Sequence, residues 1–218
     1  MPGTVREAHL SFKEKCLRYF SYCLVNLVQR PKVCGPKKPA LDQPSIFVCR
    51  HVGLMDPVII MVLYFRKIVR PLVAKDYVDK SNFTKSFYKT AQCLTLDRRN
   101  PAAKQWIADS MAALEKGESV LIFPEGKRNK SGKPGLMPFH NGAALLAARS
   151  GAQLIPVYNK FWKFPHRYRL SIGAPFRLPP VPEGGETAEW LKEQTALIRQ
   201  KVAELEPFAE GTTPSARS

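Results

Sequence analysis

The sequence lacks the cysteine pairs that stabilise small secreted domains. Its five cysteines are odd in number, no two are spaced as Cys-x-x-Cys, and no cleavable signal is recognisable. We therefore expect a reduced, cytoplasm-facing compartment. The sequence also lacks a run of about 18 consecutive apolar residues, the length that a spanning helix needs. It thus predicts a protein that can lie on a membrane without crossing it.

Acidic residues are scarce as well. The chain has 18 Asp and Glu against 34 Lys and Arg, a formal net charge of +16. Such an excess favours anionic partners, namely nucleic acid, anionic lipid headgroups or phosphorylated substrates, and says little about the fold. With 44% hydrophobic residues in 218, the chain can bury a substantial core, so disorder is expected only near its ends.

Two periodicities alternate along the chain. Helical spacing marks residues 8–30, 58–69, 102–117, 141–151 and 186–206, and residues 79–91 are helical or irregular. Short apolar runs typical of buried strands occupy 45–49, 70–75, 93–97, 119–126, 152–159 and 167–178. Alternating strands and helices favour an α/β fold with a mostly parallel central sheet, helices on both faces and an amphipathic N-terminal helix.

We expect one domain over residues 1–218. Within it, residues 1–30 form the amphipathic segment, 45–180 the catalytic core and 186–206 a closing helix. Ligands of parallel sheets gather at the carboxyl ends of the strands. The residues that directly follow each predicted strand are therefore the first candidates for catalytic and ligand-binding roles.

One of the four histidines follows the strand 45–49. The segment "CRHVGLMDP" places His51 just past that strand, and Asp56 lies where a helix N-cap is expected, before Pro57. Gly53 permits a tight turn that would return Asp56 to His51. The carboxylate would then fix the histidine tautomer and leave the other ring nitrogen as a base. On this motif alone a structural pair is the alternative, with Asp56 as a helix cap and His51 as a packing residue.

Two further strand ends carry charged residues. Glu125 follows the strand 119–126 in "FPEGKRNK", a segment rich in cations, and "LTLDRR" delivers Asp97, Arg98 and Arg99. Guanidinium groups bind phosphate oxygens in a bidentate manner, so a phosphate site is expected at this edge of the sheet. Each segment alone fits a solvated basic loop, but the three together favour a site.

These segments together resemble the glycerolipid acyltransferases, which include the 1-acylglycerol-3-phosphate acyltransferases. The resemblance spans residues 45–180 and rests on four blocks in order, which are His51 with Asp56 and Pro57, Arg98 after "LTLD", "FPEGKR" over 123–128, and Ile155-Pro156-Val157. Four positions depart from the family pattern: Lys127 replaces threonine, Asn129 serine, Arg50 asparagine and Gln92 glycine. The departures bear on the acceptor, because the second and third blocks are thought to hold it.

The resemblance implies a direct acyl transfer. His51, oriented by Asp56, would take the proton of an acceptor hydroxyl that attacks an acyl thioester. Glu125 would bind an acceptor hydroxyl or orient an arginine. No protein nucleophile, metal or cofactor is implied, and Cys49 is expected in the core. The co-substrate would be acyl-CoA or an acyl carrier protein thioester.

The acceptor implied by the resemblance is a lysophospholipid. It would be 1-acyl-sn-glycerol-3-phosphate, in phospholipid biosynthesis, bound by Arg98, Gly126, Lys127 and Arg128. Glycerol 3-phosphate or another lysolipid stays open as the acceptor. We expect no nucleic-acid partner, although a basic nucleic-acid-binding module is the rival from another class. A hydrolase is a second rival, but no Gly-x-Ser-x-Gly segment supplies a serine nucleophile.

Lipid substrates imply contact with a membrane. The helix over 8–30 carries aromatic residues flanked by cations, the composition of an interfacial helix, and residues 160–169 mix aromatics with cations in the same way. Each segment fits packing on the core equally well. We expect a peripheral protein on an anionic surface, at the cytoplasmic face of the cell membrane.

Overall fold

A computed structural model describes residues 11–97, 99, 105–131, 133–161 and 168–212. Its centre is a seven-stranded sheet in the order β1-β7-β6-β2-β5-β3-β4. All neighbouring strands are parallel except β6 and β7, which are antiparallel. The strands are β1 (Lys32–Val33), β2 (Ser45–Cys49), β3 (Val69–Ala74), β4 (Leu94–Leu96), β5 (Ser119–Ile122), β6 (Gln153–Phe161) and β7 (Tyr168–Ile172).

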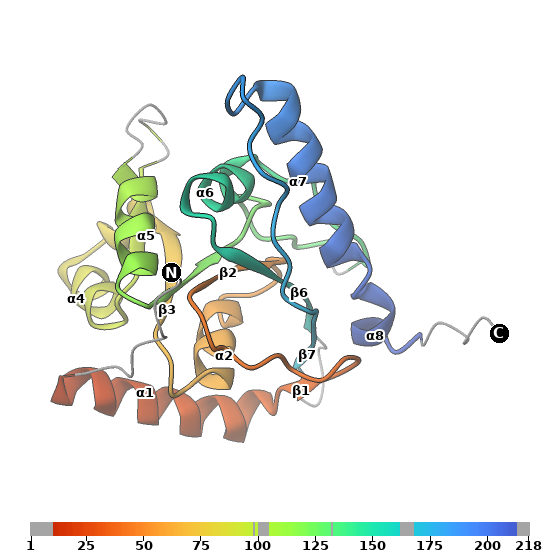
Figure 1. The fold of residues 1–218 in the computed structure, drawn as a ribbon. Helices are drawn as coiled ribbons and strands as arrows, with labels where there is room; N and C mark the ends of the chain where they lie inside the picture. The colour runs from red at the N-terminus through yellow and green to blue at the C-terminus, as the bar shows by residue number, and fades with distance from the viewer. Residues whose placement is uncertain (1–10, 98, 100–104, 132, 162–167, 213–218) are drawn as a thin grey trace.

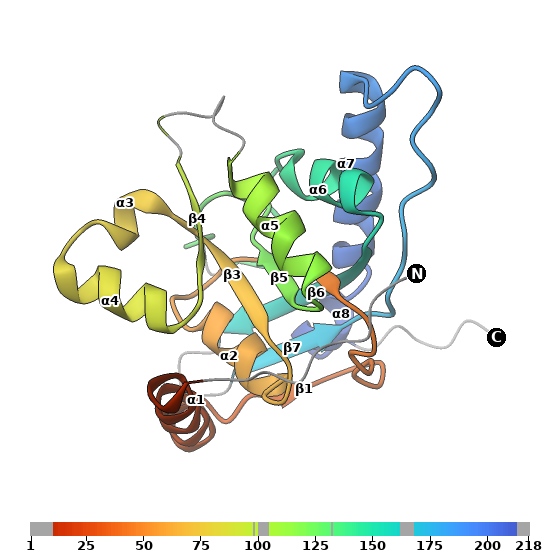
Figure 2. The ribbon, with the colours of Figure 1, turned by 60° about the vertical axis from the view of Figure 1, so that its left-hand side comes forward.

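Helices cover both faces of the sheet (Figures 1 and 2). They are α1 (Phe12–Leu24) with a π-helical turn η1 (Val25–Gln29), α2 (Asp56–Leu63), α3 (Lys75–Val78), α4 (Asn82–Thr90), α5 (Gln105–Glu115), α6 (Gly142–Ser150), α7 (Ala188–Ala203) and α8 (Glu206–Glu210). Helices α5, α6 and α7 lie on one face, and α1 and α2 on the other (Figure 1). The predicted α/β class, mostly parallel sheet and N-terminal helix are confirmed.

The alternation of side chains along β2 divides the core in two. Ile46 and Val48 pack among residues of α5, α6 and α7, whereas Phe47 and Cys49 pack with residues of α2. Every residue of β2 is buried, as expected for a central parallel strand with both faces covered. This burial fixes the end of β2, and the loop that begins at Arg50 therefore starts from a rigid point.

Several predicted elements have different bounds in the structure. The closing helix predicted over 186–206 ends at Ala203 and is followed by α8, and the strand predicted over 119–126 ends at Ile122. The helix predicted over 58–69 ends at Leu63, and Val69 begins β3, where it pairs with Ser119. Apolar β-branched residues fit either element, and pairing with β5 decides the outcome here. The last strand is shorter than predicted, since beyond β7 only Phe176 forms a bridge, with Leu154. The proline-rich connector after the first helix contains the short strand β1.

The first helix begins with Ser11 as its N-cap, in a capping box with Glu14. Among the described residues, no helix combines the length and apolar composition needed to cross a membrane.

Candidate active site

His51 and Asp56 form a hydrogen-bonded pair at the carboxyl end of β2. The Nδ1 atom of His51 lies 2.8 Å from Oδ2 of Asp56. The Asp56 side chain is fully buried, whereas that of His51 is 20% exposed. A carboxylate at Nδ1 favours the tautomer with its proton there, which leaves Nε2 as the basic nitrogen. The pairing predicted from the sequence is confirmed, and its geometry suits a general base.

The Asp56 carboxylate is held by the turn that precedes it. The backbone N–H of Val52 donates to Oδ2 at 2.7 Å, and that of Gly53 donates to both carboxylate oxygens, at 2.9 and 3.1 Å. A Cβ atom at position 53 would lie 3.2 Å from Oδ1, so glycine permits this close approach. The prediction that Asp56 is the N-cap is wrong, because Met55 is the N-cap and Asp56 is the first residue of α2. The carboxylate faces back to the loop.

Tyr168 and Asn159 complete the surroundings of Asp56. The Tyr168 hydroxyl donates to Oδ1 of Asp56, and Nδ2 of Asn159 donates to the Tyr168 oxygen. Burial, followed by the negative charge of Asp56, raises the pKa of Tyr168 well above its usual value, so the phenol remains a donor. The sequence left residues 160–169 open between a membrane-facing stretch and packing on the core. Tyr168 belongs to the core, since it is 1% exposed. Residues 162–167 of that stretch lie outside the described residues.

The segment "FPEG" after β5 packs directly against the histidine. The rings of Phe123 and His51 are stacked, with their centroids 4.2 Å apart. The backbone N–H of Asn129 donates to the carbonyl of His51 at 2.6 Å. Gly126 has a φ of +67°, and a Cβ there would lie 2.9 Å from the His140 ring. Backbone conformation and close packing thus give a physical reason for glycine at 126, beside its predicted part in binding.

Glu125 is a buried acidic residue. It is 2% exposed, and among the described residues neither carboxylate oxygen has a partner that meets hydrogen-bond geometry. Burial raises the pKa of Glu125 to about 7, although Arg50 and the backbone N–H of His51 act to lower it. A buried carboxyl group that titrates near neutral pH is typical of a functional site.

The cations of the site differ in their environment. Arg50 is buried, donates to the backbone carbonyls of Asn159 and Lys133, and stacks on Tyr158, so its role here is structural. Lys127 is exposed and Arg128 half-buried, and within the described part of the chain neither forms an ion pair. Both remain available to an anion. Arg98 lies outside the described residues.

Cys49 is the cysteine nearest to His51 in sequence. Cys49 is fully buried, as predicted, and burial raises the pKa of its thiol well above the usual value. A thiolate nucleophile at this position is therefore disfavoured. In the described ranges, no three His, Cys, Asp or Glu residues are grouped to hold a metal ion.

Comparison with known proteins places this site in a family context. The family model described as Acyltransferase matches residues 29–160. A 1-acyl-sn-glycerol-3-phosphate acyltransferase of Cocos nucifera is 32% identical over 115 residues, covering 52% of this chain and 36% of that protein. One of Pseudomonas aeruginosa is 30% identical over 132 residues, covering 54% and 49%. The chain thus spans about half the length or less of these curated relatives.

A solved structure has the same fold. It is the 1-acyl-sn-glycerophosphate acyltransferase PlsC of Thermotoga maritima, which superposes with a TM-score of 0.59 at 18% identity and covers 89% of this chain and 83% of that chain. The resemblance inferred from the four sequence blocks is confirmed by the family model, which includes His51, Asp56 and the segment from Phe123 to Arg128. The chain belongs to the acyltransferase family.

Proposed function

We propose that the protein transfers a fatty acyl group from an acyl thioester to the free hydroxyl of 1-acyl-sn-glycerol-3-phosphate. The observation that carries the proposal is the His51–Asp56 pair at the end of β2, with Phe123 of the "FPEG" segment stacked on the histidine ring. The names of the curated relatives support this acceptor. The donor is acyl-CoA or an acyl carrier protein thioester, with no further cofactor.

The residues support a direct transfer between donor and acceptor, without an acyl-enzyme. Nε2 of His51 takes the proton of the acceptor hydroxyl as that oxygen attacks the thioester carbonyl carbon. The carbon–sulfur bond then breaks, and the departing thiolate recovers the proton from Nε2. Asp56 holds the ring in place and stabilises the imidazolium that forms between the two steps. The buried Cys49 takes no part.

The acceptor's phosphate is assigned to the cations beside the histidine. In the described part of the chain, Arg128 and Lys127 form no ion pair, so a phosphate would supply their counter-charge. Arg98 and the backbone at Gly126 belong to this binding set by position in the family blocks. Glu125 is assigned to an acceptor hydroxyl, because its carboxyl group is buried beside the site and meets no hydrogen-bond partner of good geometry among the described residues.

We further propose that the protein docks peripherally on an anionic membrane at its cytoplasmic face, through α1. None of the residues of α1 is buried, and the outward side of α1 and η1 is apolar, with Phe12 81% and Phe20 65% exposed on α1 and Leu27 73% exposed on η1. The opposite side is held to the protein, since the Arg18 guanidinium donates to the carbonyls of Phe65 and Lys67. The helix thus contacts the core and still presents an apolar face, which favours docking over simple packing.

The test is product identification. Purified protein is incubated with labelled acyl-CoA or acyl carrier protein thioester and a panel of lysophospholipids, glycerol 3-phosphate and buffer alone. We expect labelled phosphatidic acid from 1-acyl-sn-glycerol-3-phosphate, lost in the His51→Ala variant. Free fatty acid formed at the same rate with and without acceptor would identify a hydrolase and overturn the proposal.

A further inference from the structure

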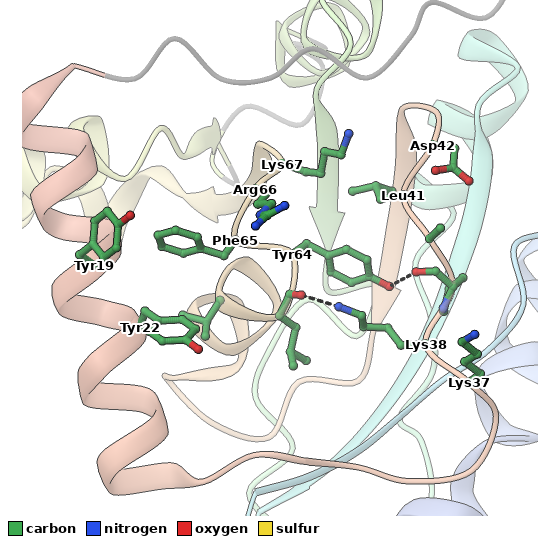
Figure 3. A pocket seen from close by; sticks show the side chains of 14 residues that line it. Tyr19, Tyr22, Lys37, Lys38, Leu41, Asp42, Tyr64, Phe65, Arg66 and Lys67 are labelled. Atoms are coloured by element: carbon green, nitrogen blue, oxygen red, sulfur yellow. Dashed lines mark hydrogen bonds between the residues drawn. The ribbon is translucent and has the colours of Figure 1, made fainter.

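A pocket, called here the basic pocket, lies at the C-terminal end of α2, whereas His51 precedes the N-terminal end of that helix. It has a volume of about 920 Å³ and is bounded by α1, the segment before β2 and the turn after α2 (Figure 3). Leu41 and Asp42, which precede β2, and Leu63 to Lys67, which follow or end α2, contribute to its lining. His51 follows β2 and precedes α2, so this basic pocket and the His51 site are at opposite ends of both elements.

The lining of the basic pocket is cationic. It contains four cations, Lys37, Lys38, Arg66 and Lys67, and one carboxylate, Asp42, which gives a net charge of +3. Lys38 is already engaged, because its Nζ donates to the carbonyl of Leu63 at 2.7 Å and lies 4.6 Å from the centre of the Tyr64 ring. In the part of the chain that the structure describes, the other three cations form no ion pair. The pocket therefore favours an anion.

Its walls are built from packed groups. Arg18 of α1 donates from its two terminal nitrogens to the carbonyls of Phe65 and Lys67, at 3.1 and 3.0 Å. The rings of Tyr19 and Tyr22 lie 5.1 and 5.5 Å from that of Phe65. Figure 3 shows Tyr19 and Tyr22 along one side of the pocket and Lys37 and Lys38 along the other. The wall formed by α1 is thus fixed relative to the cations.

The pocket adjoins the apolar side of α1. Tyr19 belongs to both, since it lines the pocket and is 61% exposed beside Phe12 and Phe20. A cation cluster next to an apolar surface matches the arrangement of a phospholipid, whose phosphate lies at the edge of the hydrocarbon region. An anion bound there would be at headgroup depth when α1 is docked.

We propose that this basic pocket binds the phosphate headgroup of an anionic membrane phospholipid, at a site separate from the acceptor site beside His51. Lys37, Arg66 and Lys67 supply the charge, and the aromatic wall contacts the glycerol and upper acyl chain. The proposal rests on membrane docking through α1 and is independent of the acyl-transfer reaction.

Residue-resolved acetylation tests it in the full-length protein. The rates at Lys37 and Lys67 are measured by mass spectrometry with phosphatidylcholine vesicles, with vesicles that also contain phosphatidic acid, with monomeric dihexanoyl phosphatidic acid and with inorganic phosphate. We expect both anionic lipids to slow acetylation of the two lysines at least fivefold, and inorganic phosphate at equal concentration to have less than a twofold effect. Lys13 reports docking of α1, and Lys192 on α7 is the distant control.

A single substitution sharpens the test. Arg66→Gln should raise the concentration of dihexanoyl phosphatidic acid that half-protects Lys37 about tenfold, the usual effect of losing one charge-assisted hydrogen bond. Arg30→Gln is the control, because it removes an arginine at the end of η1 that does not line the pocket. It should change the half-protecting concentration less than twofold. Protection of Lys13 by vesicles without protection of Lys37 and Lys67 would contradict lipid binding in the basic pocket and still support docking through α1. Equal protection by inorganic phosphate would make it a site for free anions and overturn the lipid assignment. If none of the three lysines is protected, both lipid binding in the basic pocket and docking through α1 are contradicted.

Discussion

Tyr168 donates a hydrogen bond to Asp56 across 112 residues of the chain. The contact joins β7 to the first turn of α2, and it supplies the one side chain besides His51 that hydrogen-bonds this carboxylate among the described residues. The remaining donors to Asp56 are the backbone groups of Val52 and Gly53. Tyr168 is therefore a positioning residue, which acts on His51 through Asp56.

Tyr168→Phe should lower kcat about tenfold and leave the KM of both substrates within twofold. The loss of one hydrogen bond to a charged group, about 1.5–3 kcal/mol, weakens the hold on Asp56 and on the imidazolium that it stabilises. Tyr158→Phe is the matched control, because Tyr158 is equally buried on the neighbouring strand β6 and its hydroxyl accepts from the Gly135 backbone. Equal kcat losses in the two variants would reduce Tyr168 to a packing role.

His51→Ala should leave a folded protein whose acyl transfer falls by about 10²–10⁴-fold, the usual contribution of a positioned general base. Asp56→Asn should lower the rate of acyl transfer less than His51→Ala does, but it should also destabilise the folded protein. An amide at position 56 would turn an N–H group towards backbone donors, and a buried unsatisfied group costs about 1–3 kcal/mol. Single-turnover rates and urea unfolding separate the two effects. Near-normal turnover by folded His51→Ala would remove this mechanism.

The sequence was sufficient to predict the site's local part and insufficient for the rest. His51 and Asp56 are five residues apart, so the turn between them could be read from Gly53 and Pro57. The contact of Asp56 with Tyr168 depends on the antiparallel pairing of β6 and β7, which no local pattern indicates. The cations on either side of Tyr168 in sequence fitted a membrane surface, while the core fitted equally well, so the local pattern did not place its side chain. The partner of Asp56 could be found only once the sheet order was known.

The helix positions were predicted from periodicity, but their faces were not. The first helix was expected to be amphipathic, and docking and packing on the core fitted its pattern equally. The contacts of Arg18 with two backbone carbonyls decide which side meets the protein. Such contacts depend on the turn after α2, which the sequence analysis placed inside a longer helix. An error of a few residues there was enough to hide the basic pocket.

The raised pKa of Glu125 predicts that the stability of the folded protein decreases as pH rises towards neutral. Its pKa is about 7 in the folded protein and near 4.5 in the unfolded chain. The folded state holds this proton more tightly, so the stability that it contributes is fully present below pH 4.5 and is lost as pH rises through 7. The loss is at most about 3.5 kcal/mol, since the pKa differs by about 2.5 units and each unit corresponds to about 1.4 kcal/mol.

Glu125→Gln should remove this loss because its amide does not titrate. Urea unfolding of both proteins between pH 4.5 and 8 should show the variant gaining stability over the wild type as pH rises. Glu115→Gln, at the exposed end of α5, should follow the wild-type curve. Parallel curves for wild type and Glu125→Gln would contradict the raised pKa.

Arg128→Ala should raise the acceptor's KM and spare that of the acyl donor. Losing one charge-assisted contact to phosphate corresponds to an increase of about tenfold or more. Lys127→Thr restores the residue usual in the family and should shift the ratio of kcat/KM between phosphate-bearing and phosphate-free acceptors. Lys192→Ala on α7 is the charge-matched control. Unchanged acceptor kinetics in Arg128→Ala would remove this residue from the phosphate site.

The apolar side of α1 and η1 should carry membrane binding. Phe20→Asn and Leu27→Asn alter side chains that are 65% and 73% exposed, so stability should change by less than about 0.5 kcal/mol. Vesicle affinity should fall about tenfold or more for each, because burying such a side chain contributes about 1.5–3 kcal/mol. Co-sedimentation with anionic vesicles measures this.

Two further measurements distinguish the surfaces that remain. High salt should release the protein in part, because the screening length falls to about 3 Å at 1 M, whereas the apolar contribution persists. Phe161→Asn tests the rival stretch from 160 to 169, whose described part leaves Phe161 46% exposed. If Phe161→Asn weakens binding and Phe20→Asn and Leu27→Asn do not, the docking surface lies at the end of β6, and the apolar side of α1 and η1 needs a different partner.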